Sequence, residues 1–352
     1  MWCPGIVVVF CLLTFLCGTP ALALPEFSQR YKVGCATCHA PLPQLNSVGR
    51  AFKANFYHWP EKPRERTTVP LAYQQSAVWE TTQSLAGTRQ NQLGELFFAE
   101  GISLRGGRPG ALFAQLYVQT DKTIPQRALG EAFVSLPLLG HHGELSLTLG
   151  QASALPQQYA PLTRLTQSQP GALESSAGGY SFTEPRPLAR LEWFSNRGKN
   201  TANGSYVSLA MPFNSALTLT SESEFGTGFG LSVHAFRRWN QETWGLFGYE
   251  NGADNRIGLL GTREISQTLS LLLASSTGHD LGQVTPRTTL EATWQAAPTL
   301  AVTGRWEQSP QAAYPVLALT LLPHSFPGLR LGLEASAPRG QRETKLTTRL
   351  VL

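Results

Sequence analysis

Two thiols and an imidazole lie next to one another near the N-terminus of the chain. The segment Cys35–His39 reads C-A-T-C-H, and the pattern C-x-x-C-H is the attachment site of a c-type haem. The thiols of Cys35 and Cys38 would add across the haem vinyl groups, and His39 would bind the iron as its proximal ligand. A chance pentapeptide, a disulfide and half of a zinc site are the alternatives, but no second Cys/His pair stands at zinc spacing. We therefore predict one covalently bound haem c.

The second axial ligand of the iron is less constrained than the first. Val48, Phe52 and Phe56 recur at helical spacing, which predicts a short helix that Pro60 would end. His58 follows this helix and is the other histidine of the region, so we predict it as the second iron ligand. A solvent-exposed histidine is the alternative.

Residues 1–23 have the pattern of a secretory signal peptide. An apolar core runs from Ile6 to Leu16, and Ala21–Ala23 reads A-L-A, a signal-peptidase site. Cleavage there removes three of the five cysteines and leaves Cys35 and Cys38, so we expect a fold without disulfides. Export agrees with haem attachment outside the cytoplasm.

The composition points to a membrane protein rich in β-strands. Charged residues make up 14% of the chain, against about 25% in an average soluble domain. The net charge is +5, and basic residues cluster around the haem motif, among them Arg30, Lys32, Arg50 and Lys53. They would suit haem propionates or an acidic redox partner, or form an ordinary solvated surface. We expect no nucleic-acid partner for an exported chain without a basic-aromatic motif.

From about residue 72 onward, apolar and polar residues alternate with a period of two over segment after segment. Leu145, Leu147 and Leu149 alternate with polar neighbours, and Leu331 and Leu333 alternate with charged ones. This is the lipid-out, lumen-in pattern of an outer-membrane barrel. We predict an all-β fold, an antiparallel outer-membrane β-barrel of about 16–18 strands over residues 67–352. On these faces Leu145, Leu147, Leu331 and Leu333 meet lipid, and Arg330, Glu334 and Arg349 meet the lumen.

Turn signals and tryptophans agree with a barrel. Four tight connections alternate with longer ones: Asn214–Ser215, Asn240–Gln241, Ser266–Gln267 and Ala297–Pro298. The Gln-, Pro- and Ser-rich stretch Ala154–Gly179 is expected to be the largest external loop. Five tryptophans are expected in interfacial girdles: Trp79, Trp193, Trp244, Trp294 and Trp306.

The N-terminal residues resemble a known family, the bacterial fused cytochrome–porins of the outer membrane. The resemblance rests on 25–28 (P-E-F-S), Cys35–His39, 43–46 (P-Q-L-N), 48–53 (V-G-R-A-F-K) and 55–57 (N-F-Y). Val48 stands where this family usually has Phe, and Phe56 where it usually has Gly. The family includes outer-membrane iron oxidases with one haem segment, here residues 24–66, ahead of a porin-like barrel whose lumen that segment is expected to plug.

The resemblance implies electron transfer from an extracellular donor, with Fe(II) as the expected one, through the haem to a periplasmic c-type cytochrome. Three alternatives stay open on the sequence. The chain is a transport porin whose haem segment is a plug, a haem enzyme such as a peroxidase that uses His58 and Arg50, or a periplasmic cytochrome with a soluble β-domain. His141, His142, His324 and the pair His279–Asp280 are further histidine sites in predicted turns and loops.

Overall fold

The computed structural model describes most of the chain after the predicted signal peptide. The described residues are 26–34, 37–39, 45–59, 71–82, 87–105, 107–119, 129–155, 170–173, 182, 185–199, 203–212, 231–251, 254–266, 268–280, 283–323, 329–337 and 343–351. The predicted signal peptide, Cys35, Asn214–Ser215 and His324 lie outside them. No helix among these residues is long and apolar enough to cross a membrane.

Two short helices precede a succession of strands. The helices are α2 (Glu26–Tyr31) and α3 (Ser47–Ala54), and a 3-10 turn, η2 (Gly171–Leu173), lies between β5 and β6. The strands are β1 (Leu71–Thr82), β2 (Gly87–Ser103), β3 (Pro109–Gln119), β4 (Leu129–Leu139), β5 (Leu145–Ser153), β6 (Pro185–Phe194), β7 (Gly204–Pro212), β8 (Leu231–Trp239), β9 (Glu242–Asn251), β10 (Asp254–Glu264), β11 (Leu269–Asp280), β12 (Gln283–Val284), β13 (Arg287–Ala297), β14 (Leu300–Gln308), β15 (Ala313–Leu321), β16 (Leu329–Ser336) and β17 (Glu343–Val351).

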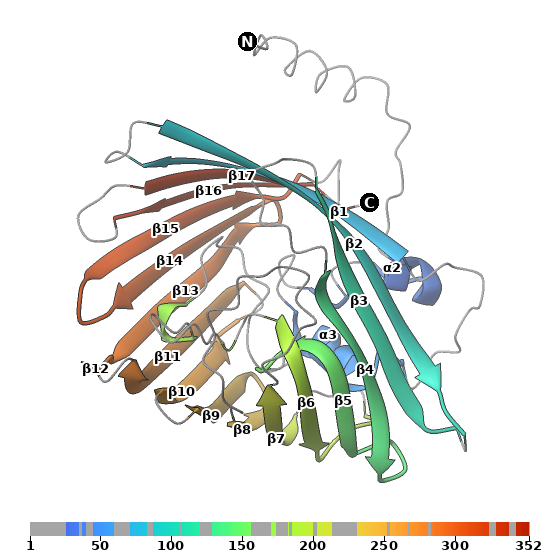
Figure 1. Cartoon of the computed structure of the whole chain (residues 1–352). Coiled ribbons are helices and arrows are strands. Elements are labelled where there is room, and N and C mark those ends of the chain that lie inside the picture. Colours follow the sequence, from blue (N-terminus) through green and yellow to red (C-terminus); the bar gives the residue numbers. More distant parts are fainter. Residues whose placement is uncertain are drawn as a thin grey trace, which may run out of the picture.

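The strands close into an antiparallel barrel (Figure 1). Each strand pairs with the next along the chain, and β17 pairs back with β1, with Gln74 opposite Val351. The two-residue β12 pairs only with the tip of β11, and β11 continues the ring to β13. The described part of the chain therefore forms a ring of 16 strands, within the predicted range. Closure leaves no unpaired sheet edge.

The two ends of the barrel differ. The connection β8–β9 at Asn240–Gln241 and the connection β13–β14 at Pro298–Thr299 are tight, and β1 begins and β17 ends on the same side as these turns. We call this side the turn end and the opposite side the loop end. Short turns on the side of both termini are the periplasmic arrangement of outer-membrane barrels.

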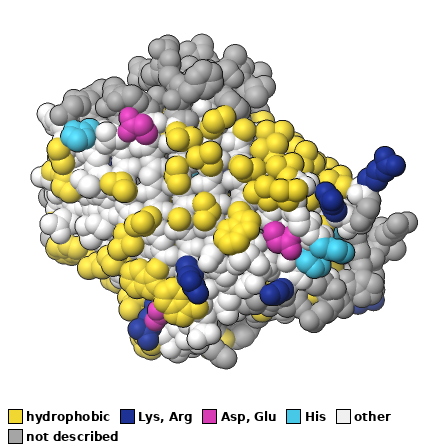
Figure 2. Space-filling model, turned by 90° about the horizontal axis from the view of Figure 1, so that it is seen from below, with side chains coloured by type: hydrophobic (Ala, Val, Ile, Leu, Met, Phe, Trp, Pro, Cys, Tyr) yellow, Lys and Arg dark blue, Asp and Glu magenta, His cyan; other side chains and the backbone are white. Residues whose placement is uncertain are grey.

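Successive side chains of each strand point to opposite faces, as the alternation predicts. Leu333 is 46% exposed on the outer face, whereas Arg330 and Glu334 are 6% and 4% exposed on the lumen face. Leu145 and Leu147 share the outer face, while Ser146 between them is buried. These predicted faces are confirmed; the side chain of Arg349 lies outside the description. Figure 2 shows hydrophobic side chains spread over one outer face, with charged side chains toward its margins.

Tryptophans lie on the outer face near both ends of the strands. Trp193, Trp244 and Trp294 are exposed close to the turn end, and Trp306 is exposed close to the loop end. This is where the two interfaces of a membrane would meet the barrel. The positions of these four agree with the girdle prediction; the side chain of Trp79 is not described.

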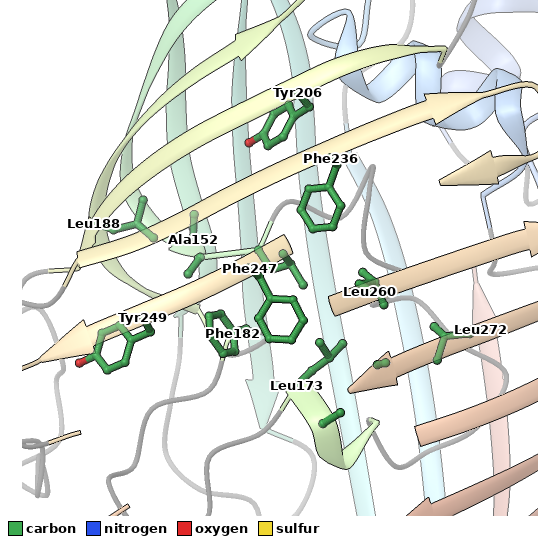
Figure 3. Close-up of a cluster of buried hydrophobic side chains, with 14 of the residues drawn as sticks. Ala152, Leu173, Phe182, Leu188, Tyr206, Phe236, Phe247, Tyr249, Leu260 and Leu272 are labelled. Atoms are coloured by element: carbon green, nitrogen blue, oxygen red, sulfur yellow. The ribbon is translucent and has the colours of Figure 1, made fainter. Parts of the chain in front are cut away.

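The connection between β5 and β6 is not an external loop where the structure describes it. Leu155, Leu173 and Phe182 are fully buried and pack on one another and on the lumen face of the barrel, beside Phe247 and Leu260 (Figure 3). The prediction of an external loop over Ala154–Gly179 is therefore wrong for Leu155 and Leu173. Their apolar side chains need a buried contact surface, and the lumen provides one.

Lumen-facing side chains fix the backbone of η2 on the far wall. Ser276 Oγ donates to Ala172 O at 2.7 Å, and Gly171 N donates to Glu307 Oε2 at 3.2 Å. Glu307 also accepts from Thr289 Oγ1 at 2.6 Å. Because β11, β13 and β14 stand across the ring from β5 and β6, the connection crosses the lumen.

Candidate functional site

The haem motif lies in a short loop that folds back onto the start of α3. Thr37 N donates to Gly34 O at 3.0 Å, and His39 forms an isolated antiparallel bridge with Leu45. Cys38 and His39 are both partly exposed. The loop thus presents a thiol and an imidazole from adjacent positions on a backbone held at both ends.

Asn46 joins this loop to the helix. Its backbone N–H donates to Cys38 O at 2.9 Å and its side-chain Nδ2 donates to Thr37 O at 3.1 Å. Its Oδ1 accepts from the N–H groups of Val48 and Gly49, both at 3.0 Å, so Asn46 is also the N-cap of α3. One side chain therefore sets the position of the motif relative to the helix.

Gly49 allows the helix to approach the motif closely. A Cβ at this position would lie 2.3 Å from Cys38 O, a distance that no side chain tolerates. A glycine in a helix destabilises it by about 1 kcal/mol relative to alanine. The absence of a side chain at Gly49 in turn lets α3 pack directly on the carbonyl of Cys38.

The helix is shorter than predicted. It ends at Ala54, before Pro60, because Phe56 and Tyr57 adopt positive φ of 57° and 59° and turn the chain back. Phe52 and Phe56 are buried as expected, but Val48 is exposed. The turn brings the aromatic residues that follow α3 against those of α2.

An aromatic cluster forms the core of residues 26–59, which we call the plug. The ring of Phe27 stacks on Tyr57 at 5.3 Å, and Phe52 contacts Phe27 and Tyr31 edge to face at 4.8 and 5.5 Å. Tyr57 also stacks on Phe113 of β3 at 6.3 Å. The plug therefore has a small core of its own that continues onto the inner wall of the barrel.

Polar contacts hold the plug in the turn end of the lumen. Arg30 Nη2 lies 2.8 Å from Glu100 Oε2 of β2, and both residues are buried. On another side, Asn55 Oδ1 accepts from Gly198 N at 2.7 Å and its Nδ2 donates to Lys199 O at 2.8 Å. These anchors join α2 to the barrel wall and the end of α3 to the β6–β7 connection, and the predicted plugging of the lumen is confirmed (Figure 1).

Two more arginines make contacts between the plug and the barrel. Arg197 of the β6–β7 connection donates to Ala54 O at 2.8 Å and lies 4.1 Å from the ring centre of Phe56. Arg50 of α3 lies 3.5 Å from Glu264 at the end of β10. The plug thus contacts walls that are far apart around the ring.

Lys53 extends from α3 into the lumen. Burial lowers its pKa to about 8; nearby Glu131 raises the pKa and Arg190 lowers it further. The ammonium lies 6.0 Å from the ring centre of Phe113. Burial therefore makes the Lys53 ammonium easier to deprotonate than that of an exposed lysine.

His58, the predicted second iron ligand, packs against the barrel wall. Its Nε2 lies 3.2 Å from Ile102 O of β2, and its ring would be 2.9 Å from a Cβ at Gly101. Ligation through Nε2 would have to replace the contact with Ile102 O. His58 as a ligand stays a prediction.

The other histidine sites named from the sequence lie at opposite ends of the barrel where the structure describes them. His141 and His142 are exposed in the β4–β5 connection at the turn end, and His279 is exposed near the loop end, where its Nδ1 lies 3.3 Å from Asn255 Oδ1. Met211 is exposed on the outer face, away from the lumen. Among the described residues, no three His, Cys, Asp or Glu side chains are close enough to hold a metal ion.

His234 is a lumen residue that sequence analysis missed. It lies on β8, fully buried, with Nδ1 2.9 Å from Ser208 Oγ and Nε2 3.1 Å from Ser232 Oγ. Its place between exposed Val233 and Ala235 in an alternating strand is the signal that would have assigned it to the lumen face.

The donor set of the plug fits a c-type haem. Cys38 provides a thiol and His39 an imidazole, and both are partly exposed on a loop fixed by Asn46. Thioether bonds to the two cysteines and an imidazole on the iron are the chemistry that this set supports. When bound, the haem would supply one-electron transfer.

Comparison with solved structures finds bacterial porins. A Rhodopseudomonas blastica porin matches with a TM-score of 0.59 and 7% sequence identity, over 80% of this chain and 99% of that chain. The outer-membrane protein OmpF of Salmonella typhi, solved with daunomycin, matches with a TM-score of 0.63 and 9% identity, over 80% of this chain and 97% of that one. No protein-family model and no curated protein matches the chain.

The chain therefore has the porin-like, outer-membrane type of β-barrel fold. At this level of identity the likeness concerns the fold alone. An apolar outer face with tryptophans near both rims is what a barrel needs in order to sit in a bilayer, and it supports an outer-membrane location.

Proposed function

We propose that this chain is an outer-membrane electron conduit, in which a haem c on the plug accepts electrons from an extracellular donor, Fe(II), and passes them to a periplasmic c-type cytochrome. The observation that carries the proposal is the C-x-x-C-H motif on a folded plug seated in the turn end of the barrel. The resemblance of the N-terminal residues to fused cytochrome–porins agrees with it.

The arrangement addresses a physical problem of charge transfer across a bilayer. A charged redox group is costly in hydrocarbon, and a barrel with a polar lumen removes that cost. The plug would hold the haem near the periplasm, while the lumen would give a small aqueous donor access from the other side. The connection that crosses the lumen at η2 narrows this route, which favours small ions over large solutes.

The proposal is tested with the full-length, haem-loaded protein in oriented proteoliposomes. Fe(II) added on the loop-end side is expected to reduce the haem, which is followed by stopped-flow absorbance, and an organic reductant serves as the control. If the organic reductant reduces the haem quickly while Fe(II) never does, Fe(II) is not the donor. A protein that carries no covalent haem after production in a cytochrome-maturing host would overturn the proposal entirely.

A transport porin whose haem segment acts as a plug is the second candidate, and the porin-like fold favours it. Single-channel conductance separates the two. The conduit is expected to pass little ionic current, because the plug and the crossing connection pack against the lumen walls. A large, steady conductance of the intact protein would favour transport.

A haem enzyme is the third candidate. It would need His58 and Arg50 as acid–base groups at the haem, but both side chains are held by other contacts. The His58 ring lies on Ile102 O, and the Arg50 guanidinium lies on Glu264 and donates to Leu45 O at 3.0 Å. A peroxidase needs such groups directed at the distal face of the haem. Peroxide-dependent oxidation of a dye by the haem-loaded protein, abolished in the variant Arg50→Gln, would revive this candidate.

A further inference from the structure

The fold rearranges the basic residues that cluster around the haem motif in the sequence. Arg30 is buried against Glu100, Arg50 pairs with Glu264, and Lys53 extends into the lumen. Of this group Lys32 remains exposed on the plug, in the turn after α2. The members of the cluster that the structure describes therefore do not form a basic surface by themselves; Lys62, Arg64 and Arg66 of the same cluster lie outside the described residues.

Two barrel connections bring other cations to the rim of the plug. Arg105 and Arg108 are exposed in the β2–β3 connection, a few residues beyond the Ile102 carbonyl that meets His58. Lys199 is exposed in the β6–β7 connection, and its own carbonyl accepts from Asn55 of the plug. Both connections thus flank the plug directly.

The described side-chain partners of Arg108 and Lys199 are neutral oxygens. Arg108 Nη1 donates to Leu138 O at 3.4 Å, and Lys199 Nζ donates to Asn196 Oδ1 at 3.1 Å. Two acids of the turn end are paired with arginines, whereas Glu144 of the β4–β5 connection accepts from the backbone N–H of His142 at 3.2 Å. Glu264 is held by Arg50 and by Arg238 at 2.9 Å, and Glu242 lies 3.1 Å from Arg263.

We propose that Arg105, Arg108 and Lys199 form a cationic rim that docks an acidic periplasmic redox protein beside the haem motif. The inference rests on the proposed function and adds the charge of the partner. A complementary charged rim mainly accelerates encounter and orients the partner. The two connections lie on one part of the barrel mouth and both flank the plug. A partner docked on them would lie next to the plug, which keeps the electron-transfer distance short.

The test uses the full-length, haem-loaded protein in detergent and one probe in two charge forms. Native cytochrome c has a basic surface, and succinylation of its lysines makes that surface acidic while the haem stays in place. The pre-reduced protein passes one electron to the ferric probe, and stopped-flow absorbance gives the second-order rate constant at several ionic strengths. The acidic form is expected to react at least ten-fold faster than the native form at low salt, and the difference is expected to shrink as salt screens the rim.

The variant that removes the rim is R105Q/R108Q/K199Q, and the matched control is Arg263→Gln. Arg263 is 62% exposed at the same end of the barrel, but on the outer face and paired with Glu242. The triple variant is expected to lose about ten-fold in rate with the acidic probe at low salt, and the control is expected to lose little. Haem staining and a heat-modifiable band establish that each variant is folded and loaded.

Three results would overturn the inference. The first is equal rates for the two probe forms, and the second is equal losses in the triple variant and the control. The third is a triple variant that exchanges electrons normally but inserts poorly into vesicles containing anionic lipid, which would assign the rim to lipid contact. In all three the haem still exchanges electrons, so the proposed function stands; a protein without haem fails the proposed function instead.

Discussion

The plug and the barrel wall direct their apolar side chains in opposite ways. In the plug, Tyr31, Phe52 and Tyr57 pack on one another and exclude water, as in a small soluble domain. In the wall, Val233 and Leu333 point outward and the polar partners point inward. The plug is stabilised by a core, and the wall by closure of its backbone pairing and by contact with lipid.

Some apolar side chains of the wall point into the lumen instead of outward, and they show where the two regions meet. Phe194, Phe236 and Phe247 are aromatic residues of the wall that point into the lumen, and all are buried. They pack in the cluster that also contains Ala54 of the plug and Phe182 of the β5–β6 connection (Figure 3). An apolar residue on a lumen face therefore marks a place where another part of the chain is docked.

The largest effect is expected from substitutions in the haem motif, which change the chemistry of the plug and leave the barrel wall intact. Cys38→Ala or Cys35→Ala removes one thioether and is expected to abolish stable covalent haem, whereas His39→Ala is expected to shift the absorbance spectrum. Haem staining after denaturing electrophoresis measures the first, and absorbance of the folded protein the second. The barrel should keep its heat-modifiable band, and Met211→Leu on the outer face should stain normally. A fully stained Cys38→Ala band would contradict the assignment.

The second largest effect is expected from the ion pair between Arg30 of the plug and Glu100 of the wall. Arg30→Ala leaves Glu100 buried without its ion pair, which is expected to weaken plug docking by about 3–5 kcal/mol. Single-channel current and protease cleavage of the plug should both rise. The double variant Arg30→Ala/Glu100→Ala removes both charges and should recover most of the docking. Similar leakage from the single and the double variant would mean that the pair does not hold the plug.

The third effect tests the two faces of the wall at adjacent positions. Leu333→Arg places a charge on the lipid side near the middle of β16 and is expected to cost about 2–4 kcal/mol, while Glu334→Gln on the lumen side should cost much less. Urea titration of the free energy of unfolding in lipid vesicles measures both. Equal losses would be inconsistent with the assigned faces.

The smallest effect concerns the link between the haem loop and α3. Asn46→Ala removes the N-cap and the hydrogen bond to Thr37 O, and is expected to cost about 1–2 kcal/mol. Asn46→Asp keeps the cap acceptor but loses the Nδ2 donor. If Asn46 positions the motif, Asn46→Asp should still shift the midpoint potential of the haem while its melting temperature changes little. A potential that moves in neither variant would limit Asn46 to capping.

Local patterns were sufficient for the wall but not for what fills it. Alternation predicted the outer and lumen faces of β5 and β16, and turn signals predicted the connection at Asn240–Gln241. Composition typical of a loop predicted an external position for Leu155 and Leu173 of the β5–β6 connection, whereas both are buried in the lumen, which offers their apolar side chains a surface. The end of α3 was misplaced because the positive φ of Phe56 and Tyr57 depends on docking.

The sequence by itself determined the haem motif, the period-two faces and the scale of the barrel, because covalent attachment depends on adjacent residues and strand faces depend on a local period. Only the tertiary structure decided which charges are paired. Arg30 and Glu100 are 70 positions apart and meet in one ion pair, whereas Arg105 and Lys199 reach the same rim from different connections. Coulomb interactions depend on distance in space and on burial, and neither can be read from the order of residues.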